Sequence, residues 1–152
     1  DGQHFGILIE NTGSTDVKLP DFNALTFNHN ALISNFVQEV KNFEAIFLDI
    51  IETNDNVAIY GAGGHAISVI NKLNLNHLNI KCLFDLSPQK AGKSSPCGNV
   101  PIKTPSQNSL SDINTVIIIA SLHQMEVFSF LVKDCNFKGN TYGTYPSIEK
   151  LQ

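Results

Sequence analysis

Apolar residues recur along residues 31–51 with the spacing of an α-helix. The apolar positions are Leu32, Ile33, Phe36, Val37, Val40, Phe43, Ile46, Phe47, Ile50 and Ile51. Residues three or four apart share one face of a helix, so the spacing predicts a helix roughly 30 Å long at about 1.5 Å per residue. We expect this helix to pack against the domain that follows. Docking to another module or subunit is the alternative.

Ahead of this helix, residues 5–9 (Phe-Gly-Ile-Leu-Ile) form a short apolar run followed by a polar, turn-rich stretch. Such a run is typical of a strand. Residues 1–54 are therefore expected to form an arm of one strand and one long helix, packed on the domain of residues 55–152.

From residue 56 onward, short apolar runs alternate with helical spacing. Strands are predicted at residues 57–60, 80–84, 100–102, 115–120 and 139–143, and helices at 66–73, 106–110 and 125–132. The run 115–120 is almost wholly β-branched, as expected of a central parallel strand that is covered on both faces. Alternating strands and helices predict an α/β fold in three layers, with a parallel sheet and right-handed crossovers.

A glycine cluster follows the first of these strands. The sequence Tyr60-Gly61-Ala62-Gly63-Gly64-His65-Ala66 has the form G-x-G-x-x-A. Gly61 is suited to the tight turn out of the strand, Gly63 to close approach of a pyrophosphate, and Ala66 to close packing of helix on strand. The free N–H groups and the positive dipole end of the next helix favour an anion at this turn. We therefore predict that Gly61, Ala62, Gly63, Gly64 and His65 face a ligand phosphate, as in a Rossmann-like domain.

Four further residues are candidates for the rim of this site. Asp85 ends the second strand, where the acid of a dinucleotide-binding unit bonds the ribose hydroxyls; a turn-capping aspartate is the alternative. Ser121 and His123 follow the strand of residues 115–120, at the edge where parallel sheets bind ligands, although a helix cap also suits Ser121. Lys90 lies in the loop after Asp85 and either meets an anionic ligand or is solvated.

Composition limits what the site can contain. All ten basic residues are lysine and the net charge is −4. Without arginine there is no bidentate guanidinium, so backbone N–H groups must hold any phosphate, and nucleic acid is an improbable partner. No apolar run reaches the roughly 20 residues of a membrane span. Cys82, Cys97 and Cys135 lack the spacing of metal ligands and indicate reduced thiols in a cytoplasmic protein.

The sequence names no chemical step. The five histidines are scattered, and no Ser-His-Asp order or paired carboxylates stand out, so the catalytic residues stay unknown. Gly92-Lys93-Ser94 imitates the end of a P-loop, but it follows the second strand and lacks the earlier glycine of that motif.

The chain from Tyr60 onward resembles the C-terminal Rossmann-like domain of sugar C-methyltransferases. The resemblance rests on the glycine turn, on residues 85–92 (Asp-Leu-Ser-Pro-Gln-Lys-Ala-Gly), on Pro96 and on residues 100–102 (Val-Pro-Ile). Cys97 stands where the family has glycine. Those enzymes use S-adenosylmethionine to methylate carbon in nucleotide-linked deoxysugars. The resemblance implies a domain that binds a nucleotide-linked sugar, and an upstream methyltransferase domain that binds S-adenosylmethionine, so this fragment would hold no cofactor.

Two ligand-binding alternatives remain, beside a degenerate Rossmann domain that binds no ligand and only scaffolds a partner. Residues 59–66 also look like the N-terminal domain of sugar O- and N-acyltransferases, which contacts a UDP-sugar. The hexapeptide repeats of those proteins are absent here. An NAD-dependent oxidoreductase or epimerase is the other alternative, in which Asp85 would favour NAD over NADP. No Tyr/Lys pair at helical spacing supports it.

Overall fold

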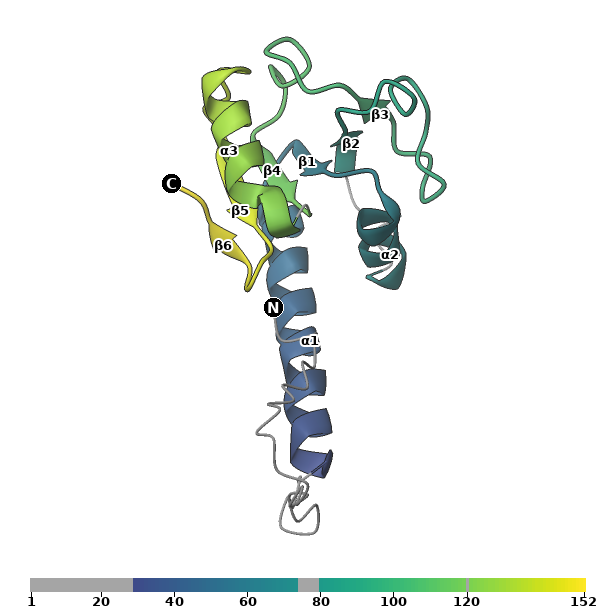
Figure 1. Cartoon of the computed structure of the whole chain (residues 1–152), viewed down its shortest axis with the longest axis vertical. Helices are drawn as coiled ribbons and strands as arrows, with labels where there is room; N and C mark the ends of the chain where they lie inside the picture. Colours follow the sequence, from purple (N-terminus) through teal and green to yellow (C-terminus); the bar gives the residue numbers. More distant parts are fainter. Residues whose placement is uncertain (1–28, 74–79, 120) are drawn as a thin grey trace, which may run out of the picture.

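The computed structural model describes residues 29–73, 80–119 and 121–152 (Figure 1). The strand predicted at residues 5–9 lies outside these ranges. The elements, in chain order, are α1 (His29–Thr53), β1 (Val57–Tyr60), α2 (Gly64–Lys72), β2 (Ile80–Phe84), β3 (Ile102–Lys103), β4 (Thr115–Ile118), the 3₁₀ turn η2 (Ser121–His123), α3 (Gln124–Lys133), β5 (Asn140–Gly143) and β6 (Glu149–Lys150). Helices thus precede and follow β1 and separate β4 from β5 as the apolar pattern predicts, whereas β2, β3 and β4 follow one another without a helix between them.

The strands form one sheet in the order β3-β2-β1-β4-β5-β6. The first five strands in this order pair in parallel, and β6 pairs antiparallel with β5. The predicted parallel sheet is therefore confirmed, and β6, which the sequence did not predict, adds an antiparallel strand at one edge. The short connection from Gly143 to Glu149 explains it, because a parallel pair needs a crossover of a dozen residues or more.

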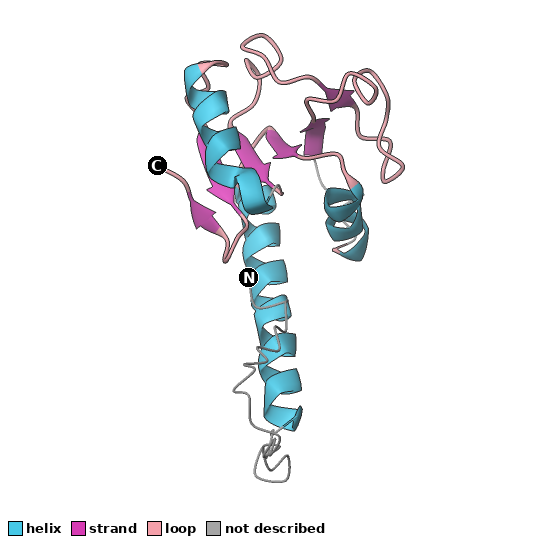
Figure 2. Ribbon diagram, viewed as in Figure 1, coloured by secondary structure: helices cyan, strands magenta, loops and turns pink. Residues whose placement is uncertain are grey.

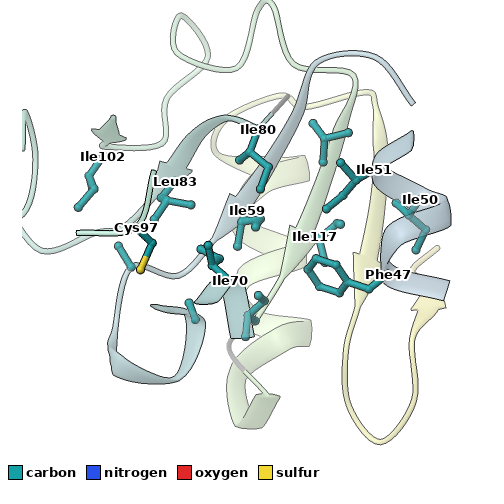
Figure 3. Packing of buried hydrophobic residues seen from close by; sticks show 14 residues of the cluster. Phe47, Ile50, Ile51, Ile59, Ile70, Ile80, Leu83, Cys97, Ile102 and Ile117 are labelled. Atoms are coloured by element: carbon teal, nitrogen blue, oxygen red, sulfur yellow. The ribbon is translucent and has the colours of Figure 1, made fainter. Parts of the chain in front are cut away.

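Helices α1 and α2 pack on one face of the sheet and α3 on the other, which makes the domain three-layered (Figure 2). On one face, Val57 and Ile59 of β1 pack in a cluster with Ile70 of α2 and Phe47 of α1 (Figure 3). On the other face, Ala58 and Tyr60 belong to a cluster that includes Leu131 of α3. All four residues of β1 and all four of β4 are buried, as expected of central parallel strands.

The two ends of α1 differ in their surroundings. Near its C-terminal end, Phe47, Ile50 and Ile51 are buried in the sheet-facing cluster, and the Phe43 and Phe47 rings stack with centroids 5.7 Å apart. Toward its N-terminus, the same apolar stripe is open: Leu32 is 60% exposed and Phe36 62%. The helix projects away from the sheet (Figure 1). The expected packing against the domain is thus found for the C-terminal part of α1 only.

Residues 106–110 form turns and no helix, contrary to the sequence prediction. The Ser109 hydroxyl donates to the carbonyl of Thr104 and accepts the backbone N–H of Ser106. Serine side chains that bond nearby backbone groups compete with helical hydrogen bonds, which accounts for the difference. The short strand expected at 100–102 is displaced to Ile102–Lys103, while Pro101 forms an isolated bridge with Ser94 and its carbonyl accepts the Leu83 N–H at 2.9 Å.

Candidate functional site

The glycine turn lies at the carboxyl end of β1, in the middle of the sheet. Gly61 has a φ of 119°, which side-chain-bearing residues rarely adopt, and its N–H donates to the Phe84 carbonyl at 2.7 Å. Gly63 is the N-cap of α2, with no side-chain cap. Strand order reverses between β1 and β4, and open α/β sheets bind ligands at this position.

Two glycines of the turn have open space beside them. A Cβ atom built on Gly63 or Gly64 would meet no described atom within 4 Å, and neither residue has a positive φ. Contacts within the described chain therefore give no reason for glycine at these two positions. The N–H groups of Gly63, Gly64 and His65 begin a helix, so helical geometry leaves them without intrahelical acceptors. The His65 side chain is exposed.

Ala66 packs as the motif predicts. It is 2% exposed, and a Cβ on Gly61 would lie 3.7 Å from the Ala66 methyl group. A larger residue at position 66 would push α2 away from the turn. The small third residue of the motif therefore serves close helix–strand packing.

Asp85 follows β2 and is bonded through both carboxylate oxygens. Its Oδ2 accepts the Ala62 N–H at 3.1 Å and the Lys90 ammonium at 2.8 Å, and its Oδ1 accepts the Ser87 N–H at 2.9 Å. Burial raises the pKa of the carboxyl, but the bonds from Lys90, Ser87 and Ala62 outweigh burial and leave the pKa below its ordinary value. Asp85 is therefore ionised at neutral pH and joins the glycine turn to the loop after β2.

The structure thus brings Ala62, Asp85 and Lys90 together. The Ala62 N–H, which the sequence assigns to a phosphate, is donated to Asp85 instead. The Lys90 side chain is 38% exposed while it pairs with Asp85, so a lysine ammonium lies next to the turn.

Ser121 and His123 lie where β4 leads into α3. Ser121 is the first residue of η2, and its side chain is outside the described part of the structure. The exposed His123 ring lies 3.1 Å from Glu126 Oε2, one helical turn further on. The structure therefore places His123 in a surface pair at the start of α3.

Sequence reasoning missed Gln124. Its Oε1 accepts the N–H groups of Thr144 and Tyr145, both at 3.1 Å, and its Nε2 donates to the Tyr145 carbonyl. The Thr144 hydroxyl donates to the Ile118 carbonyl at 2.8 Å. A Cβ on Gly143 would lie 2.6 Å from Gln124 Oε1, so a larger residue at position 143 would displace the glutamine side chain. These bonds fix the loop after β5 beside the end of β4, on the same sheet edge as the glycine turn.

Two absences apply to residues 29–73, 80–119 and 121–152. Among these residues, none of the helices combines the length and apolar character that crossing a bilayer requires. Within the same part of the chain, no three His, Cys, Asp or Glu side chains gather as metal ligands do.

The strand order and the turn at the switch point define a Rossmann-like α/β domain. A family model described as the C-methyltransferase C-terminal domain matches residues 21–140, and the chain belongs to this family. The match includes α1 in full.

A similar solved structure is the UDP-D-quinovosamine 4-dehydrogenase from Vibrio fischeri, which is 16% identical with a TM-score of 0.46. The similarity covers 63% of this chain and 92% of that chain. No curated protein sequence matches the chain.

Proposed function

We propose that this chain is the nucleotide-sugar-binding C-terminal domain of a sugar C-methyltransferase. The methyl donor, S-adenosylmethionine, binds a separate upstream domain of the same protein, and this domain holds and orients the methyl acceptor. The glycine turn at the strand-order reversal is the observation that carries the proposal. Membership of the C-methyltransferase C-terminal domain family supports the reaction class.

The diphosphate of the acceptor is held by backbone. Gly63, Gly64 and His65 offer N–H groups at the positive end of α2, with open space beside both glycines. The chain has no arginine, so no guanidinium competes with this backbone for the role. Lys90 adds a single positive charge next to the turn, already paired with Asp85. The exposed His65 ring contacts the bound ligand from the first turn of α2.

Isothermal titration calorimetry with dTDP-sugars, UDP-sugars and NADH tests the proposal on this chain. A nucleotide sugar should bind in the calorimeter. In a thermal-shift measurement it should also raise the melting temperature of the chain by mass action. Free sugar and inorganic phosphate, added separately, control for binding of either half alone. Binding of NADH with no binding of a nucleotide sugar would show that the domain serves a redox enzyme and would overturn the proposal.

A further inference from the structure

Asp85 has almost no bonding capacity left for a ligand. An ionised carboxylate offers roughly four lone-pair sites on its two oxygens. Two donors, from Ala62 and Lys90, occupy Oδ2, and Ser87 occupies one site on Oδ1. One acceptor site remains. A contact that uses both adjacent hydroxyls of an adenosine ribose needs two sites, so a dinucleotide bound in that way would have to displace an existing donor.

Displacing any one of these three donors would break a hydrogen bond that the fold uses. Losing the Ala62 bond detaches the glycine turn from the end of β2, and losing the Ser87 bond opens the turn after Asp85. Losing the Lys90 bond breaks an ion pair with an N···O distance of 2.8 Å. The Asp85 side chain is only 15% exposed, so it cannot meet a ribose by moving into solvent.

The bonds also show what Asp85 does for the turn. The Gly61 N–H is fixed by the Phe84 carbonyl, and the next N–H, on Ala62, is fixed by Asp85. Two successive donors are therefore anchored to the end of β2. The first donors left for a ligand are those from Gly63 onward, at the start of α2.

We infer that Asp85 is a positioning residue that sets the direction of the glycine turn, and that its pairing with Lys90 makes the domain discriminate against adenine dinucleotides. The inference rests on the proposed function, and it narrows the ligand to a nucleotide diphosphate whose ribose is not held by the acid after β2.

Backbone amide exchange, followed by NMR on this chain without ligand, tests the positioning role. In Asp85→Ala the Ala62 N–H should exchange at least tenfold faster than in the wild type, because its acceptor is gone. Asp85→Asn keeps an amide oxygen and should restore most of the protection. Equal Ala62 exchange in the wild type and Asp85→Ala would overturn the inference.

Titration with ADP-ribose tests the discrimination. The wild type should bind ADP-ribose at least tenfold more weakly than Lys90→Met does, since the variant frees one site on Oδ2. Lys93→Met removes the same charge from the exposed part of the same loop and should leave ADP-ribose affinity unchanged. Equal affinities of the wild type and Lys90→Met for ADP-ribose would contradict the inference. Tight binding of ADP-ribose by the wild type that becomes tenfold weaker in Asp85→Asn would contradict it too.

The result that would overturn the proposed function differs from the results that would overturn the inference about Asp85. If no nucleotide sugar binds, that proposal falls, while Ala62 exchange and the ADP-ribose comparison still decide the role of Asp85.

Discussion

Asn54 accepts a hydrogen bond of 3.1 Å from the hydroxyl of Thr115 through its side-chain oxygen. Its amide nitrogen donates to the Ile50 carbonyl at 2.8 Å, so one side chain ties the last turn of α1 to the first residue of β4. Thr115 is fully buried. The end of the long helix is therefore fixed to a central strand of the sheet by a polar contact as well as by its apolar residues.

Thr115→Val should lower the free energy of unfolding by about 1 kcal/mol, because it removes a buried hydrogen bond while keeping the shape of the side chain. Urea denaturation measures the change. Thr104→Val, at an exposed position, is the matched control and should have little effect. If the effects of Thr115→Val and Asn54→Ala simply add in the double variant, the two side chains are not coupled and the account of this contact is wrong.

The two ends of α1 should respond differently to the same substitution. Phe47→Ala should destabilise the domain by about 3–5 kcal/mol, because it empties a fully buried position in the core. Phe36→Ala, at a 62% exposed position on the same stripe, should change the free energy of unfolding by about 0.5 kcal/mol or less. Thermal and urea unfolding of both variants checks this. A large loss in Phe36→Ala would mean that the N-terminal part of α1 is also packed in the isolated chain.

Cys82 should make stability fall at high pH. Burial raises the pKa of its thiol from 9.0 to about 11, partly opposed by Lys103. Between these values the unfolded chain loses the proton and the folded chain keeps it, so unfolding becomes easier as pH rises. The wild type should lose about 2 kcal/mol more than Cys82→Ala between pH 9 and pH 11, since one pKa unit corresponds to about 1.4 kcal/mol. Urea titrations at both pH values measure it, and parallel pH curves for the two proteins would refute the assignment.

Much of the fold follows from local sequence. The limits of β1 and β2 agree with prediction because each is an apolar run that ends at a glycine or an aspartate. β6 was not foreseen, because Glu149 and Lys150 are exposed and carry no apolar alternation. Nor could the stripe on α1 reveal which of its ends is buried, since Phe36 and Phe47 look alike in sequence.

The position of the glycine turn was predicted from the sequence, but its hydrogen bonds were not. The glycine spacing locates the turn, and the strand order places it where the sheet reverses. The pairing of Asp85 with Ala62 spans 23 residues and depends on the pairing of β1 with β2, which sets Tyr60 opposite Phe84 and which no short-range pattern encodes. Gln124 reads as an ordinary polar residue in the first turn of a helix, yet it holds Thr144 and Tyr145 some 20 residues away.

The central claim is that the glycine turn binds the diphosphate of a nucleotide sugar. Gly63→Val tests it most directly, because its Cβ would meet no described atom within 4 Å and φ is −89°. The variant should fold with a loss of about 1 kcal/mol or less from the poorer N-cap. Ser68→Val places the same valine side chain at an exposed position further along α2.

Calorimetric titration with dTDP- and UDP-sugars then compares the three proteins. The account predicts that the nucleotide sugar that binds the wild type binds Ser68→Val equally and Gly63→Val at least tenfold more weakly. Equal affinity in wild type and Gly63→Val would show that the diphosphate does not approach this turn, and would contradict the central claim.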